Sequence, residues 1–85
     1  MELLVELDHG TGSTRDVSVG GVFFVTLQRF SPGDPIELTL VLEHLDPDYH
    51  PVHLYCRGQV VRVEPNDGNM GVAVEITAYR VAPPA

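Results

Sequence analysis

The sequence predicts an all-β protein, more specifically a small antiparallel six-stranded barrel. Its 85 residues contain no sustained stretch in which apolar residues recur every three to four positions, as an amphipathic helix requires. They contain instead short apolar or alternating stretches, about 8 to 12 residues apart and separated by turn residues, which is the spacing of strands in sandwiches and barrels. At this length we expect one domain, residues 1–78, followed by a frayed C-terminal tail, residues 79–85.

The first half of the chain predicts three strands. Residues 2–7 (ELLVEL) place leucine and valine on one face and glutamate on the other, before turn residues at 8–13 (DHGTGS) break the pattern. Residues 21–27 (GVFFVTL) are apolar on both faces. After the loop at 30–35 (FSPGDP), residues 36–42 (IELTLVL) alternate most regularly in the chain and predict a strand with isoleucine and leucine inward.

A long strand is expected over residues 54–64 (LYCRGQVVRVE). Its apolar positions change parity, from Leu54 and Cys56 on one side to Val61 and Val63 on the other. A bulge or bend at the glycine between them, Gly58, would explain the change.

The last strand follows a hairpin. Residues 65–68 (PNDG) are a turn signal, and residues 71–76 (GVAVEI) predict the returning strand with its valines and isoleucine inward.

Composition limits the partners. The net charge is -7, and the five basic residues are all arginines scattered along the chain, so the sequence predicts no surface for DNA or RNA. No apolar run approaches the roughly 18 residues that a membrane span needs, and there is no secretion leader, so we expect a cytoplasmic protein without membrane insertion. A single cysteine allows no disulfide within the chain.

The segment DVSVGG, residues 16–21, stands out. On an extended strand Asp16 and Ser18 face the same way, and the valines at 17 and 19 can pack beneath them. The two glycines allow positive φ and a close approach of a flat ligand to the backbone. A carboxylate, a hydroxyl and open backbone can together read the edge of a guanine. In the other interpretation, the segment is only a glycine-rich bend whose polar side chains bond nearby backbone.

At this segment the sequence resembles the PilZ domain family, bacterial receptors for the second messenger cyclic di-GMP. The family motif is Asp or Asn, any residue, Ser, two residues of any type and Gly, and it is matched by Asp16, Ser18 and Gly21, with Gly20 giving a double glycine. The stretches VFFVTL, FSPGDPIELTLVL, GQVVRV and MGVAVEI follow in the family's order. The resemblance implies that Asp16, Ser18, Gly20 and Gly21 bind cyclic di-GMP.

The sequence departs from the family pattern in one respect, and two functions therefore remain possible. Family members that bind cyclic di-GMP carry an Arg, three residues and a second Arg before the first strand, whereas here the first strand is expected at residues 2–7. Either the chain is a receptor whose arginines come from further sequence or a partner, or it is a PilZ domain that binds no nucleotide and acts as a protein-interaction adaptor. The C-terminal helix of many members is also missing. We therefore expect Leu4, Phe23 and Val41 to form an apolar patch for a protein partner or a homo-oligomer.

No enzyme is predicted, and no cofactor or metal. The loop from His44 to His53 carries three histidines and two aspartates, but prolines interrupt it and its spacing matches no common metal motif. Cys56 is expected to be a buried apolar residue rather than an activated thiolate. Ser18 lacks the Gly-x-Ser-x-Gly pattern of a hydrolase nucleophile, so no catalytic residue is assigned.

Overall fold

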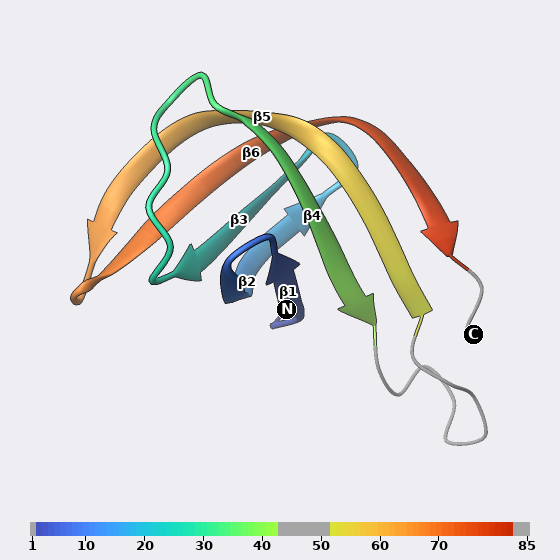
Figure 1. Cartoon of the computed structure of the whole chain (residues 1–85), viewed down its shortest axis with the longest axis horizontal. Helices are drawn as coiled ribbons and strands as arrows, with labels where there is room; N and C mark the ends of the chain where they lie inside the picture. The colour runs from blue at the N-terminus through green and yellow to red at the C-terminus, as the bar shows by residue number, and fades with distance from the viewer. Residues whose placement is uncertain (1, 43–51, 83–85) are drawn as a thin grey trace.

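Six antiparallel strands close into a barrel in the computed structural model, which describes residues 2–42 and 52–82 (Figure 1). The strands are β1 (Leu4–Leu7), β2 (Gly10–Ser18), β3 (Gly21–Thr26), β4 (Pro35–Leu42), β5 (Val52–Asn66) and β6 (Asn69–Ala82). Around the barrel they are ordered β1-β2-β3-β6-β5-β4, and β4 pairs with β1 to close it. The all-β, six-stranded fold that the sequence predicts is therefore confirmed.

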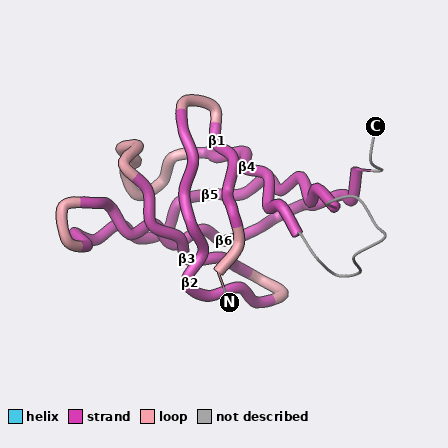
Figure 2. Tube along the Cα trace, turned by 90° about the horizontal axis from the view of Figure 1, so that it is seen from below, coloured by secondary structure: helices cyan, strands magenta, loops and turns pink. Residues whose placement is uncertain are grey.

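Strand makes up most of the described chain, and loops are confined to the connections between strands (Figure 2). The part of the chain that the structure describes contains no helix long and apolar enough to cross a membrane.

The core fills the barrel with alternate residues of each strand. Val5, Phe24 and Val60 are fully buried, and the ring of Phe24 packs edge-on against Phe30 with 6.3 Å between centroids. The inward face predicted for residues 36–42 is confirmed, because isoleucine and leucine at 36, 38 and 40 are all buried. Packing of this apolar interior supplies the main stabilisation.

The apolar patch expected at Leu4, Phe23 and Val41 does not form as predicted. Leu4 and Val41 are neighbours across β1 and β4, but Val41 is only 5% exposed although it lies on the outer face. Phe23 is half-buried, because its ring lies over a glycine of β6, Gly71. Of the three side chains, only Leu4 is largely exposed.

β2 begins earlier than the sequence suggests. The expected break at residues 8–13 is limited to the turn at 8–9, and β2 starts at Gly10. A Cβ on Gly12 would lie 2.7 Å from the carbonyl oxygen of Val25. This glycine therefore serves close strand packing rather than a turn, which is a second use of glycine in sheets.

The β5–β6 hairpin confirms the turn predicted at residues 65–68. Asp67 and Gly68 are its two turn residues, and both have positive φ, 47° and 84°. This is the conformation that favours Asp-Gly in two-residue hairpins.

The pairing of β5 with β6 is irregular at two places. It shifts at Gly58, where a Cβ would collide with the carbonyl oxygen of Glu75, but the extra residue there belongs to β6, and β5 itself keeps alternating, with Cys56, Gly58 and Val60 all buried. The prediction that a bend at Gly58 causes the change of parity is therefore wrong. A second shift falls between Val60 and Arg62. Because Val61 is the extra residue, Val60 is buried and Val61 is 53% exposed, so the prediction that Val61 shares the face of Val63 is wrong.

The frayed tail expected from Tyr79 is wrong for residues 79–82. β6 continues to Ala82, and β5 starts early enough to pair with each of these residues, from Cys56↔Tyr79 to His53↔Ala82. Residues 83–85 lie outside the described part of the chain.

Candidate functional site

The DVSVGG segment is the hairpin that joins β2 to β3. Asp16 and Ser18 are near the end of β2, Val19 and Gly20 form a two-residue turn, and Gly21 begins β3. The Ser18 hydroxyl donates a long hydrogen bond, 3.4 Å, to the carbonyl oxygen of Gly21. Asp16, Ser18 and Gly20 are exposed, so all three can be reached from solvent.

A bulge at Arg15 decides which face Asp16 occupies. Thr14 is fully buried, and the pairing of β2 with β3 shifts between Thr14 and Asp16. With Arg15 as the extra residue, Asp16 pairs with Phe23 and shares the outer face of the barrel with Ser18. Regular strand alternation would place Arg15 and Asp16 on opposite faces of the sheet, but the bulge interrupts that alternation.

The valines of the segment do not pack as expected. Val17 pairs with the buried Val22, yet it is 37% exposed. Val19 is 97% exposed because it lies in the turn. The expectation that both valines pack beneath the polar side chains is thus wrong for Val19.

The two glycines have different roles, and neither has positive φ. A Cβ on Gly21 would lie 2.8 Å from the carbonyl oxygen of Val74, so glycine lets β3 approach β6 closely. The carbonyl of Gly20 accepts a 3.0 Å hydrogen bond from the amide of Ile76, which fixes the turn against β6. A Cβ on Gly20 would meet nothing within 4 Å, so the space above the turn is open.

Strand pairing adds an aromatic ring and a cation to this surface. Asp16 is opposite Phe23, Phe23 is opposite Ala73, and Ala73 is opposite Arg62. We call Asp16, Phe23, Ala73 and Arg62 the outer row. The guanidinium carbon of Arg62 lies 5.7 Å from the centre of the Phe23 ring, a cation–π contact. The sequence could not reveal this row, because its members come from four strands.

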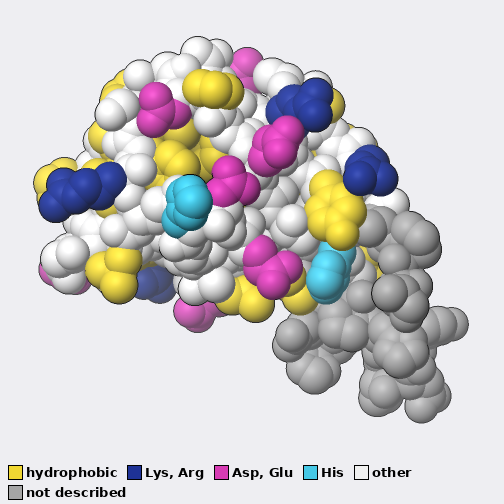
Figure 3. All heavy atoms as spheres, viewed as in Figure 1, with side chains coloured by type: hydrophobic (Ala, Val, Ile, Leu, Met, Phe, Trp, Pro, Cys, Tyr) yellow, Lys and Arg dark blue, Asp and Glu magenta, His cyan; other side chains and the backbone are white. Residues whose placement is uncertain are grey.

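One carboxylate lies beside this cation and another beside the motif. Nε of Arg62 lies 3.6 Å from a carboxylate oxygen of Glu64, and both side chains are about half exposed or more. Glu75 pairs with Gly21 and is exposed beside the motif. Figure 3 shows acidic and basic side chains interspersed on the face it views.

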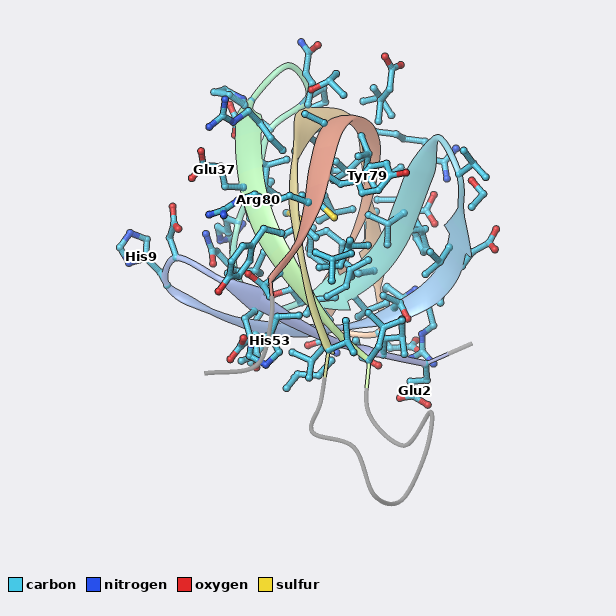
Figure 4. The ribbon with its side chains drawn as sticks, turned by 90° about the vertical axis from the view of Figure 1, so that its right-hand side faces the viewer. Glu2, His9, Glu37, His53, Tyr79 and Arg80 are labelled. Carbon is cyan, nitrogen blue, oxygen red and sulfur yellow. The ribbon has the colours of Figure 1, made fainter. Side chains whose placement is uncertain are left out.

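A second polar surface lies on the outer face of β4, β5 and β6. It borders a cavity of about 700 Å³, one wall of which is the end of β1 and the turn after it. Arg57 pairs with Glu37 at 3.3 Å, and the guanidinium carbon of Arg80 lies 5.0 Å from the centre of the Tyr55 ring. Figure 4 shows Arg80 and Glu37 on the side of the sheet where the β1–β2 hairpin projects, with Tyr79 on the other side.

Cys56 is buried, as predicted. Burial raises the pKa of its thiol, and the sulfur lies 3.7 Å from the carbonyl oxygen of Leu54. A thiol of raised pKa stays protonated at neutral pH and is a poor nucleophile.

The histidine-rich loop lies outside the described residues, except for His53 on β5. Within the described part, no group of three or more His, Cys, Asp or Glu side chains could hold a metal ion.

Comparison with known proteins identifies the family. No curated protein and no solved structure matches the chain significantly. The family model described as PilZ domain matches residues 2–82. Since this match spans nearly the whole chain, from β1 to the end of β6, the chain belongs to the PilZ domain family.

Proposed function

We propose that this PilZ domain is a signalling module that binds cyclic di-GMP on the outer face of β2, β3, β6 and β5. The observation that carries the proposal is the outer row, which brings the motif carboxylate, an aromatic ring and a guanidinium onto one surface. The module acts by binding rather than by catalysis. Because its ligand is a bacterial messenger, we place it in the bacterial cytoplasm.

Each motif residue has a defined role in this proposal. Asp16 accepts hydrogen bonds from the N1 and N2 donors of a guanine, and Ser18 donates or accepts at the same base. The open space at Gly20 leaves room for the base. Asp16, Ser18 and Gly20 are three of the four residues that the family resemblance implies, and all three are exposed; the fourth, Gly21, lets β3 pack closely on β6.

Arg62 is the cation that we assign to the phosphate or to the second base. Its planar guanidinium offers paired donors to a phosphate and a flat face for stacking. It lies three strand spacings from Asp16, about 14 Å across the sheet. One guanine cannot contact both side chains at that separation, so Arg62 faces a different part of the ligand.

Charge works against tight binding. The chain carries a net charge of -7, and Glu64 competes with a phosphate for Arg62. One arginine in place of two also removes a charge-assisted contact of about 1.5–3 kcal/mol, or about 10- to 100-fold in affinity. We therefore expect weaker binding than a domain with the arginine pair would show.

Calorimetric titration with cyclic di-GMP at low and moderate salt tests the proposal. Asp16→Ala, Ser18→Ala and Arg62→Ala should each weaken binding, the charged residues by about 10- to 100-fold. The matched control is Arg80→Ala, which removes an arginine stacked on Tyr55, outside the outer row. Equal loss in Arg62→Ala and Arg80→Ala would show that only overall charge matters.

The alternative function is a PilZ domain that binds no nucleotide and acts as a protein-interaction adaptor. It is favoured by Glu75, which lies beside the motif, and by Glu64, which lies beside Arg62, because both carboxylates repel an anionic ligand. Absence of heat at millimolar cyclic di-GMP would reject the receptor proposal for this chain and favour the adaptor.

A further inference from the structure

The last six residues of β6 have an open edge. β3 pairs with β6 only from Met70 to Glu75, whereas β5 continues to pair with β6 as far as Ala82. Within residues 2–42 and 52–82, no strand pairs with the other edge of β6 from Thr77 onward. In Figure 1 this end of β6 runs past β3 on the side of the C-terminus. An edge of this kind offers unpaired N–H and C=O groups to another strand.

A bulge at Thr77 separates this edge from β3. Ile76 pairs with Gly58 and Ala78 pairs with Arg57, so Thr77 is the extra residue on β6. The Thr77 hydroxyl donates a 3.1 Å hydrogen bond to the carbonyl of Arg57, which holds the bulge in place. A bulge bends its strand, so the open edge begins where β6 turns away from its neighbour.

The open edge has few of the features that protect sheet edges. Residues 77–82 contain no proline and only one charged residue, Arg80. Tyr79 and Val81 are 66% and 61% exposed and lie together on one face, opposite the face of Arg80. The edge thus presents apolar groups on one side of the sheet and a cation on the other.

Arg80 gives the open edge a preference for an acidic partner segment. Its guanidinium is held over the Tyr55 ring, and neither of the ion pairs between described residues involves it. The cavity of about 700 Å³ extends from Arg80 across β5 and β4 to the end of β1, away from the open edge. A strand added at the open edge of β6 would therefore meet, on the outer face, a guanidinium that stacks on an aromatic ring and is not ion-paired with any described residue.

We propose that residues 77–82 of β6 bind an extended segment of a partner protein, which adds as a seventh strand. The segment has apolar residues that alternate with acidic ones, so that apolar side chains contact Tyr79 and Val81 while a carboxylate pairs with Arg80. Main-chain hydrogen bonds supply affinity and the alternate side chains supply specificity. This site lies apart from the outer row, so it can work whether or not the domain binds nucleotide.

Synthetic peptides test the inference. The probe is acetyl-Ser-Val-Asp-Val-Asp-Val-Ser-amide, and the matched peptide carries lysine in place of aspartate. Amide chemical shifts of the ¹⁵N-labelled chain are followed up to millimolar peptide. We expect the largest shifts at residues 77–82 and about fivefold tighter binding of the acidic peptide, because an opposite-charge pair across strands contributes up to about that factor. N-methylation of the peptide's valines should abolish binding.

Two variants keep the test specific. Arg80→Glu should reverse the preference and make the lysine peptide bind better, and Arg29→Glu, an exposed arginine in the β3–β4 connection, should leave it unchanged. Equal binding of the two peptides, shifts centred elsewhere, or no binding at millimolar concentration would overturn the proposal. So would a concentration-dependent dimer in sedimentation whose interface maps to residues 77–82, because the occupant would then be a second copy of the chain.

Discussion

Replacing Gly21 by alanine should destabilise the barrel, whereas replacing its neighbour Gly20 should not. An ideal Cβ on Gly21 lies 2.8 Å from the carbonyl oxygen of Val74, and real Cβ atoms essentially never approach another heavy atom closer than 3.0 Å. The obstructing atom is backbone, so no side-chain rotation relieves the contact and β3 must move away from β6. Overpacking of this kind costs about 1–3 kcal/mol.

Gly20→Ala provides the matched control. Its Cβ would meet nothing within 4 Å, and its φ is not positive, so alanine fits without strain. In both variants alanine restricts the unfolded chain, which stabilises the folded state by about 0.4–1 kcal/mol. Because this gain is common to both, the free energies of unfolding of the two variants should differ by about 1–3 kcal/mol.

Urea unfolding followed by circular dichroism measures this difference, since the chain has no tryptophan. In thermal unfolding, each kcal/mol should correspond to about 4–8 °C in Tm for a domain of this size. If Gly20→Ala destabilises the domain as much as Gly21→Ala, the steric explanation of the double glycine is refuted. A change in ligand binding by Gly20→Ala could then be due to lost stability rather than to a lost contact with the ligand.

Three further predictions concern the glycines and the thiol. Gly58→Ala should destabilise the domain by about 3 kcal/mol or more in urea unfolding, because its Cβ collides with the carbonyl oxygen of Glu75 near the β6 bulge at Thr77; a loss below about 1 kcal/mol would show that the bulge adapts easily. Gly71→Ala should weaken cyclic di-GMP binding, because its Cβ would lie 2.7 Å from Cζ of the Phe23 ring and would displace the ring that contacts Arg62. Unchanged affinity in calorimetry would contradict this role of the ring. Burial raises the pKa of the Cys56 thiol, so its contribution to stability is complete below the unfolded-state pKa and is lost as pH rises through the folded-state pKa. The alkaline loss should therefore be smaller in Cys56→Ala, and identical pH profiles of unfolding for the two proteins would contradict the assignment.

Local patterns in the sequence were enough to predict the elements whose geometry is local. The strict alternation of residues 36–42 and the Asp-Gly turn after β5 are both found in the structure, because strand parity and turn conformation depend on adjacent residues. The early start of β2 was missed, since glycine at position 12 signals a turn by composition but serves close packing on β3.

The candidate site could be predicted only in part. The motif residues were identified from their spacing, whereas Phe23 and Arg62 join them through the pairing of four strands. Such pairings depend on barrel closure and on register, which no short stretch of sequence encodes. The extended end of β6 was missed for a similar reason, because its partner residues at the start of β5 precede it by more than 20 positions.

The outer row depends on two bulges, which turn Asp16 and Arg62 to the outer face of the barrel. Continued alternation from the buried Thr14 would turn Asp16 inward, and continued alternation from the buried Val60 would turn Arg62 inward. In each strand one extra residue, Arg15 or Val61, is inserted between the buried residue and the row residue, and the extra residue is itself exposed. The same insertions thus keep two charged side chains out of the apolar core and place them on one surface, which links the stability of the barrel to the formation of its candidate site.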